Sequence, residues 1–383
     1  MTEREAAIKV ASKLINKNFE TYFAGGCVRD KILERECKDI DIATAATPEQ
    51  VIELFPNADQ VGKHFGVIVV KEGGHSFEVA TFRSDGCYSD NRRPDSVTFT
   101  SAYEDAKRRD FTINALFEHP LTGEIIDFVN GLSDLKSKTI RCVGSPDERF
   151  KEDALRIIRC VRFRAQLGFE YHFDTVNACK RHSNNLKNVS IERIQQEVQK
   201  ILESDYPWSI TELFDLNREG QFNDLFEPNN LGQIHLMNHD NSLVSNLSVM
   251  GWNDFELKDL KFPNNVIKTV NYIRKHRDFV MAWPTHTVAE RRRVCCLDHL
   301  DDILSTLKRK QYEPISDGIS DLRSAFSFCG VEMNPKPLIT GDDLINMGYQ
   351  EGPQIAILLK QCRNLQMSKG VIDKEDIIVT LNL

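Results

Sequence analysis

The sequence lacks long apolar runs and Cys-x-x-Cys pairs. No stretch approaches the ~18 consecutive apolar residues of a membrane-spanning helix, which argues against a membrane protein. The ten cysteines are scattered, with only Cys295 and Cys296 adjacent, so neither a disulfide framework nor a zinc site is indicated. The start, MTEREAAIKV, lacks the basic and apolar regions of a signal peptide. We therefore expect a cytoplasmic protein with reduced thiols.

Excess positive charge is also missing. Acidic residues number 57 and basic residues 49, which gives a formal net charge of -8. This excludes a uniformly cationic coat, so any contact with RNA must be local. At 383 residues, 41% hydrophobic and 28% charged, the chain has the composition of a globular protein with two or more packed units.

Strand-like runs are confined to the first part of the chain. They alternate with helical stretches and read TYFAGG, FGVIVV, HSFEVATF, SVTFT and EIIDFV. From Arg141 onward helical periodicity dominates, broken by the polar stretches FEPNNLG and KFPNNV. The sequence therefore predicts an α+β fold, with a mixed β-sheet first and helices after it. Near the end, Thr340, Gly348, Pro353 and Gly370 predict the limits of two short helices.

Two glycines stand between a strand-like and a helix-like run in FAGGCVRDKIL. Gly25 and Gly26 would let the backbone approach a ligand closely, and the start of a helix attracts anions. Arg29 adds a positive charge. This turn could therefore bind a phosphate, although a purely structural turn is the alternative.

Paired carboxylates follow in KDIDIAT. In a strand, Asp39 and Asp41 would face one side and Ile40 and Ile42 the other. Carboxylates this close repel unless a cation bridges them, and two Mg²⁺ ions could serve a phosphoryl transfer. The alternative is an exposed acidic edge strand. Glu78 in HSFEVATFR is a candidate third catalytic carboxylate, or simply a solvent-facing residue.

Several motifs carry a family resemblance. GGCVRD, DID and FEVATFR resemble the nucleotidyltransferase superfamily that includes DNA polymerase beta. Three later motifs resemble one branch of this superfamily: YEDAKRRDFTINAL, NGLSDL and RFKEDALRIIRCVRFRAQLGF. This branch contains the bacterial poly(A) polymerases and the tRNA nucleotidyltransferases, which include the bacterial and eukaryotic CCA-adding enzymes. The resemblance implies a polymerase-beta-like catalytic head at 1–140, a helical neck at 141–205, a helical body at 206–325 and a tRNA-binding helical tail at 326–383.

The resemblance also implies roles for single residues. Gly26, Arg29 and Arg109 fall on positions that contact the triphosphate, and the two aspartates of DID fall on the metal ligands. From the residues alone, Arg108 and Arg109 could neutralise triphosphate charge while Asp110 caps a helix formed by FTINAL. The whole predicted nucleotide site comprises Gly25, Gly26, Arg29, Arg109, Asp110, Asn114, Glu152, Asp153, Arg156, Arg159 and Arg162.

A row of polar residues in EDALRIIRCVRF predicts how the base is chosen. Asp153 and three arginines recur every third residue along one predicted helix. Asp153 can accept from the amino group of cytosine or adenine and Arg156 can donate to ring acceptors, which rejects uracil and guanine. We expect Glu152 to support Arg156. In the family this EDxxR motif acts as a protein template for CTP and ATP, whereas the alternative is a salt-bridged surface helix.

The implied activity is addition of C, C and A to the acceptor arm of tRNA from CTP and ATP, with Mg²⁺ as cofactor. Addition of A alone, poly(A) polymerisation and an inactive RNA-binding module are the alternatives. In the family, enzymes that stop after CC tend to have a shortened loop before Asp110, so the long polar loop here, which includes Arg83, Asp90, Arg92 and Arg93, disfavours addition of CC alone. Poly(A) polymerases of this branch usually carry a strongly basic C-terminal extension, so the acidic chain ending in IIVTLNL disfavours poly(A) polymerisation.

Two further sequence features were considered as functional sites. The RRRV stretch at 291–294 could touch phosphates, although a solvated basic cluster is the alternative. His239 and Asp240 form an HD pair without convincing partner ligands, so we predict no phosphohydrolase activity.

Overall fold

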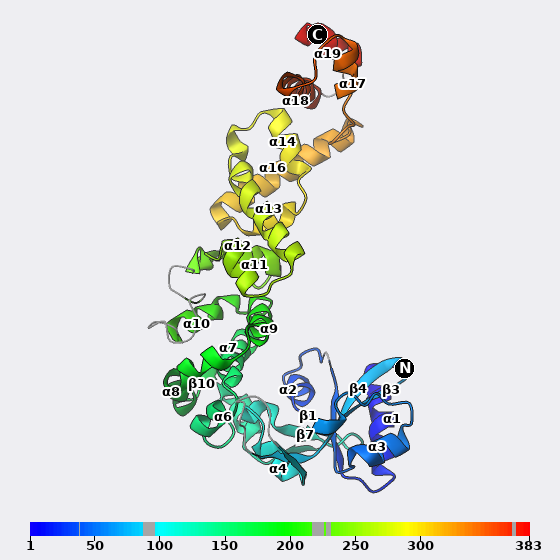
Figure 1. The fold of residues 1–383 in the computed structure, drawn as a ribbon, viewed down its shortest axis with the longest axis vertical. Coiled ribbons are helices and arrows are strands. Elements are labelled where there is room, and N and C mark those ends of the chain that lie inside the picture. Colours follow the sequence, from blue (N-terminus) through cyan, green and yellow to red (C-terminus); the bar gives the residue numbers. More distant parts are fainter. Residues whose placement is uncertain (38, 87–95, 217–225, 227–230, 370–372) are drawn as a thin grey trace. The chain divides into compact units, whose positions relative to one another are not determined.

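A computed structural model describes residues 1–37, 39–86, 96–216, 226, 231–369 and 373–383. The chain forms two compact units, 1–228 and 229–383. The first unit carries a mixed sheet with helices, and the described residues of the second unit are helical, which confirms the predicted α+β fold (Figure 1). The expected domain boundaries at 140, 205 and 325 remain predictions, because the structure divides the chain only once, between residues 228 and 229.

The first unit begins with the sheet and ends with helices. Its strands are β1 (Thr21–Ala24), β2 (Asp41–Thr44), β3 (Val67–Glu72), β4 (His75–Thr81), β5 (Arg83–Asp85), β6 (Val97–Phe99), β7 (Leu116–Glu118), β8 (Ile125–Asp127), β9 (Thr139–Ile140) and β10 (Glu170–Tyr171). Its α-helices are α1 (Glu3–Ile15), α2 (Gly26–Ile32), α3 (Pro48–Leu54), α4 (Ala102–Lys107), α5 (Gly131–Lys136), α6 (Pro146–Glu152), α7 (Leu155–Leu167), α8 (Phe173–His182), α9 (Ile191–Leu202) and α10 (Thr211–Leu216). Short 3-10 turns are η1 (Lys63–Phe65), η2 (Thr112–Asn114), η3 (Ser183–Asn188) and η4 (Pro207–Ile210).

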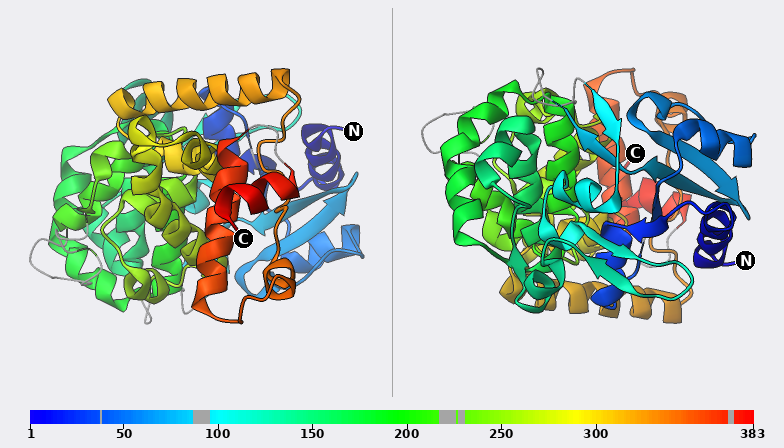
Figure 2. Two further views of the ribbon diagram at one scale, coloured as in Figure 1. Left: turned by 90° about the horizontal axis from the view of Figure 1, so that it is seen from above. Right: turned by 90° about the horizontal axis from the view of Figure 1, so that it is seen from below.

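Six strands form one sheet in the order β3-β4-β2-β1-β7-β8. Strands β2 and β4 run parallel, and the other neighbours are antiparallel. Helices α1 and α3 pack against the sheet and against each other, and α1 is the dark blue helix beside the strands in Figure 2. The side chains that fill this core include Ile42, Ile68, Val70, Phe77 and Val79.

Two local predictions were wrong. FTINAL is no α-helix, because Thr112–Asn114 form the 3-10 turn η2 and Leu116 begins β7, which pairs with β1 and β8. Strand β10, which pairs in parallel with β9, interrupts the helices expected after Arg141. In both cases pairing with a distant strand overrides local preference. SVTFT supplies the predicted strand β6, which pairs with β5 outside the main sheet.

The predicted single helix through EDALRIIRCVRF is two helices. Helix α6 ends at Glu152, Asp153 is extended with φ −148° and ψ 104°, and α7 starts at Leu155. The Leu155 amide donates to Asp153 Oδ1 at 3.0 Å, a local bond that favours a new helix start. The three arginines of the predicted row therefore share α7, whereas Asp153 lies at its entrance.

The described part of the second unit holds two apolar clusters. One joins α13, α14, α15 and α16, the long orange helix of Figure 2, and the other joins α17, α18 and α19. Its helices are η7 (Ile234–Leu236), α11 (Leu243–Val249), α12 (Asp254–Asp259), α13 (Asn264–Met281), η8 (Trp283–Thr285), α14 (Val288–Cys295), α15 (Leu300–Ser305), α16 (Arg309–Phe328), α17 (Gly341–Asn346), α18 (Pro353–Ser368) and α19 (Lys374–Leu381). None of the helices in the described ranges combines the length and apolarity of a membrane span.

The predicted helix ends near the C-terminus agree with the structure. Thr340 caps α17 through a capping box, Gly348 has a φ of 97°, and Pro353 opens α18. Gly370 lies outside the described residues, and α19 was not predicted. The nine described cysteines are free thiols, as the sequence indicated.

Candidate active site

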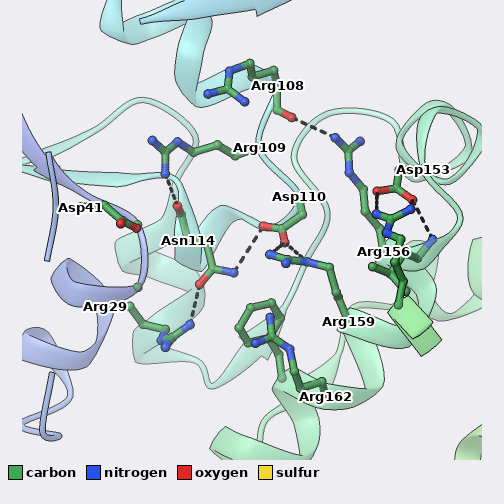
Figure 3. A pocket seen from close by; sticks show the side chains of 15 residues that line it. Arg29, Asp41, Arg108, Arg109, Asp110, Asn114, Asp153, Arg156, Arg159 and Arg162 are labelled. Atoms are coloured by element: carbon green, nitrogen blue, oxygen red, sulfur yellow. Dashed lines mark hydrogen bonds and ion pairs between the residues drawn. The ribbon is translucent and has the colours of Figure 1, made fainter. Parts of the chain in front are cut away.

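A cavity of about 480 Å³ lies in the first unit (Figure 3). Its walls come from the turn between β1 and α2, the start of β2, the 108–114 segment, the α6–α7 junction, and helices α7 and α9. Seven arginines and three aspartates give the lining an excess of four positive charges, which suits a polyanionic ligand. The lining residues are Gly25, Gly26, Arg29, Asp41, Arg108, Arg109, Asp110, Asn114, Asp153, Leu155, Arg156, Arg159, Arg162, Phe163 and Arg193.

The glycine turn stands directly beside Asp41. Strand β1 ends at Ala24, which pairs with Asp41 across the antiparallel ladder. Gly25 has a φ of 77°, and a Cβ there would meet Arg109 Nη1 at 3.0 Å. The Gly25 amide already donates to Leu116 O at 3.0 Å. Gly25 therefore supports the site by allowing Arg109 to approach closely rather than by offering its own amide.

The three predicted carboxylates share one face of the sheet. Strand β2 starts only at Asp41, but Asp39 and Asp41 are exposed while Ile40 and Ile42 are buried, as period-two alternation requires. The parallel register pairs Ile42 with Val79, which brings Glu78 alongside Asp41. Glu78 is thus both exposed to solvent and adjacent to the predicted metal ligands.

Desolvation and charge repulsion act together on Asp41. Desolvation by the surrounding protein and the charges of Glu78 and Asp39 together raise the pKa of Asp41 to about 6, although the guanidinium of Arg109 opposes them. A bound cation would relieve this repulsion. Among the described residues, no three His, Cys, Asp or Glu side chains form a complete metal site. The donor set therefore fits an ion that also takes ligands from a substrate.

A chain of hydrogen bonds connects the glycine turn to α7 (Figure 3). Arg29 Nη1 donates to Asn114 Oδ1 at 2.6 Å, and Asn114 Nδ2 donates to Asp110 Oδ1 at 3.3 Å. Arg159 Nε donates to Asp110 Oδ2 at 2.8 Å. Asp110 thus links the two walls of the cavity instead of capping an α-helix, although it accepts from the Phe111 amide.

The ion pair with Arg159 lowers the pKa of Asp110. Burial alone would raise that pKa, but the charge and hydrogen bonds of Arg159 outweigh burial and lower it to about 2. Because the folded-state pKa lies below the ordinary value of 3.8, the stabilisation is complete above about pH 4 and is lost as the pH falls toward 2.

Asp110→Asn is therefore expected to cost about 2 kcal/mol at pH 7 and to lower the unfolding temperature by several degrees. The difference from the unsubstituted protein should shrink at pH 3. Thermal unfolding at both pH values measures this, with Asp59→Asn, an exposed carboxylate in the same unit, as control. An equal difference at pH 7 and pH 3 would contradict the ion-pair explanation.

The predicted base-selecting pair lies at the entrance of α7. Arg193 on α9 grips the Asp153 carboxylate with two bonds, Nη2 to Oδ2 at 2.7 Å and Nη1 to Oδ1 at 3.2 Å. The expected ion pair of Glu152 and Arg156 is present at 2.5 Å, and Arg156 Nη2 also donates to Arg108 O at 3.3 Å. Both side chains are thus held in place at the cavity wall.

Three lining residues were absent from the predicted site: Leu155, Phe163 and Arg193. Arg108, which the sequence predicted beside Arg109, also lines the cavity. Phe163 receives the guanidinium groups of Arg162, Arg29 and Arg159 at 4.1, 5.3 and 5.7 Å from its ring centroid. An aromatic next to the arginine row was a usable signal for Phe163. No local pattern connects Arg193 with Asp153, because 40 positions separate them.

Not every predicted residue lines the cavity. Asp39, Glu78 and Glu152 are missing from its lining, although Glu78 and Asp39 act on Asp41 by charge and Glu152 holds Arg156. Of the predicted polar loop, Asp90, Arg92 and Arg93 lie outside the described residues. Arg83 is described and pairs with Asp85 at 3.0 Å.

Comparison with known proteins identifies relatives over the whole chain. A family model described as the poly(A) polymerase head domain matches residues 21–141, and one described as a probable RNA and SrmB binding site of polymerase A matches 168–217. A CCA-adding enzyme of Oceanobacillus iheyensis is 34% identical over 403 residues, covering 97% of this chain and 95% of the relative. One of Lactobacillus helveticus is 48% identical over 196 residues, covering 51% of this chain and 49% of the relative.

Solved structures agree in fold. The CCA-adding enzyme of Bacillus stearothermophilus in complex with CTP has a TM-score of 0.76 at 28% identity, covering 100% of this chain and 98% of the other. The Thermotoga maritima CCA-adding enzyme complexed with tRNA has a TM-score of 0.67 at 21% identity, covering 98% and 93%, and supports the fold alone.

Proposed function

This chain belongs to the family of CCA-adding enzymes, and we propose that it adds C, C and A to the 3′ end of tRNA from CTP and ATP, releasing pyrophosphate. One observation carries the proposal: a single cavity joins Asp41, a cluster of arginines and the Asp153–Arg156 pair. These are the three elements that a template-independent nucleotide transfer requires, namely a carboxylate for the metal, cations for the triphosphate and polar groups for the base.

We assign Asp39 and Asp41 as ligands of Mg²⁺, with Glu78 as the adjacent third carboxylate. Magnesium commonly binds one or two carboxylates together with substrate phosphates, which suits a site that is incomplete without the nucleotide. When bound, the ions would neutralise charge on the attacking and leaving oxygens of the transfer. The raised pKa of Asp41, caused by desolvation and by repulsion from Glu78 and Asp39, supports this assignment, because a bound cation would offset both.

The side chains of the cavity supply positioning. Arg29 and Arg109 stand beside the glycine turn, where they bind the triphosphate and orient the α-phosphorus toward the 3′-hydroxyl of tRNA. The 3′-hydroxyl gives up its proton to solvent or to the carboxylate of Asp39 or Asp41, and its oxygen forms the new bond to this phosphorus as the bond to the pyrophosphate oxygen breaks. Asp105 accepts from Arg109 at 3.0 Å and Asn114 accepts from Arg29 at 2.6 Å, which fixes both guanidinium groups beforehand.

Asp153 and Arg156 select the base. A carboxylate has about four lone-pair sites, so Asp153 can hold both bonds from Arg193 and still accept from the amino group of cytosine or adenine. Arg156 donates to the ring acceptor beside that amino group. Uracil and guanine present a carbonyl oxygen to Asp153 instead, and two acceptors repel.

Relatives aligned over nearly the full chain favour CCA addition over the alternatives. The Oceanobacillus relative is a CCA-adding enzyme, and the alignment leaves little of either chain uncovered. Addition of A alone and poly(A) polymerisation have no comparable support. The tRNA acceptor arm as partner and a cytoplasmic location are parts of the same proposal.

The test is incorporation of labelled CTP and ATP into tRNA transcripts ending before CCA, after C and after CC, with Mg²⁺ present. We expect C, C and A in turn, followed by a stop. EDTA should abolish incorporation, and added Mg²⁺ should restore it. Labelling by ATP alone on the CC transcript would instead indicate an A-adding enzyme, long A tails a poly(A) polymerase, and no labelling an inactive RNA-binding module.

A further inference from the structure

Arg292 lies at the centre of the second unit with no exposed surface. It belongs to the RRRV stretch of α14, which the sequence predicted either at phosphates or in a solvated cluster. Both readings are wrong for Arg292. Its guanidinium stands 4.6 Å from the ring centroid of Phe326 on α16. A fully buried arginine is costly unless its donors are satisfied, so the position demands a structural reason.

The donors of Arg292 bind backbone carbonyls of two other segments. Nη1 donates to the end of α18, at Met367 O (2.7 Å), Gln366 O (3.4 Å) and Lys369 O (3.4 Å). The last carbonyls of a helix lack partners within the helix and carry partial negative charge, which favours a cation there. Nη2 donates to Glu332 O at 2.6 Å and Nε to Met333 O at 3.2 Å.

Helix α18 binds the same linking segment, which joins α16 to α17. Arg363 Nη1 donates to Pro335 O at 2.6 Å, and Gln366 Nε2 donates to Lys336 O at 2.8 Å. Gln366 is 4% exposed and also accepts from the Leu338 amide at 3.4 Å. The backbone between 332 and 338 is therefore held from two helices, α14 and α18.

We propose that Arg292 is a positioning residue that fixes helices α17–α19 onto helices α13–α16 and thereby presents one rigid surface to tRNA. This inference rests on the proposed function and on the tRNA-binding role expected of the tail at 326–383. Arg292 belongs to α14 of the α13–α16 apolar cluster, and its hydrogen bonds reach α18 of the α17–α19 apolar cluster. These bonds therefore determine how the second cluster is oriented on the first. Only the planar fork of arginine reaches α18 and the linking segment together, which a lysine ammonium cannot do.

The experiment compares kcat and KM of Arg292→Met for tRNA and for CTP. If the α17–α19 helices are docked correctly only one-tenth of the time, KM for tRNA rises about tenfold, while kcat and KM for CTP stay unchanged. Arg292→Lys should also raise KM for tRNA, because lysine keeps the charge but lacks the planar guanidinium.

The matched control is Arg274→Met. Arg274 on α13 likewise donates to carbonyls that end a helix, Leu247 O, Ser248 O and Met250 O of the α11 region, at 2.9–3.1 Å.

Circular dichroism first establishes that each variant is folded. A folded Arg292→Met protein with an unchanged KM for tRNA would overturn the proposal, as would an equal rise in Arg274→Met. If Arg292→Met does not fold, Gln366→Met decides, because it removes the side-chain bonds of Gln366 to the linking segment and to Arg363, leaves the backbone carbonyls that Arg292 contacts in place, and should also raise KM for tRNA. Absence of incorporation by the unsubstituted protein would instead reject the proposed function.

Discussion

Asp41→Asn is expected to slow nucleotide addition by about 10³-fold or more, the scale for removing a group that holds charge in the transition state. Asparagine keeps the size of the side chain but removes the negative charge. It also removes a charge that desolvation and the repulsion from Glu78 and Asp39 disfavour, as the raised pKa of about 6 reflects, so the folded protein should be no less stable at pH 7. Single-turnover addition of C to a tRNA transcript, together with thermal unfolding, measures both effects.

The control for this prediction is Asp59→Asn. Asp59 is exposed in the same unit, and its bond from the Val61 amide at 3.1 Å can be accepted equally well by asparagine. Its activity should match that of the unsubstituted protein. Glu78→Gln tests the third carboxylate, and a loss much smaller than that of Asp41→Asn would assign Glu78 to tuning charge rather than to catalysis. Asp41→Asn with undiminished activity would refute the metal assignment.

Asp153→Ala is expected to reduce the preference for CTP over UTP by roughly 10²-fold, the upper range for losing one well-placed base contact. The loss should appear mainly as gained UTP use, because the substitution removes the acceptor that repels the uracil carbonyl. Values of kcat/KM for CTP and UTP on the same transcript give the ratio. Strict use of C and A by the folded variant would reject the selecting role of Asp153.

Asp153→Asn separates base selection from local structure. The amide oxygen of asparagine can still accept from the Leu155 amide and so keep the start of α7, while its NH₂ group can donate to a carbonyl. This variant should therefore accept UTP with little loss of stability. Arg193→Met should loosen Asp153 without removing it, and we expect a smaller fall in the CTP preference. An equal fall in both variants would assign selection to the Arg193–Asp153 pair as a unit.

Much of the candidate site was predictable because its signals are local. The alternation of Asp39, Ile40, Asp41 and Ile42 follows from strand geometry, and the exposed and buried positions match it even though β2 begins only at Asp41. The glycines before α2 indicated a strand-to-helix turn with close approach of the backbone, and Gly25 in that turn adopts a φ of 77°. Such features depend on a few consecutive residues, and the backbone decides them.

The errors occurred where distant partners decide structure. FTINAL has helical propensity, yet β1 and β8 flank Leu116–Glu118 and draw this segment into the sheet. EDALRIIRCVRF was predicted as one helix, but the Asp153 side chain bonds to the Leu155 amide and to Arg193, and both bonds favour a break. Periodicity indicates which face of a segment is apolar. It does not indicate which distant residues or strands that segment will contact.

The sequence by itself thus determined the alternation of the candidate catalytic carboxylates, the glycine turn, the arginine row and the caps at Thr340 and Pro353, because spacing and local backbone chemistry specify them. Tertiary structure alone decided that Glu78 stands beside Asp41, that Arg193 holds Asp153, and that Arg292 is buried among carbonyls of α18 and its neighbouring segment. Those pairings join residues far apart in the chain. They arise from strand register and helix packing, which no local pattern encodes.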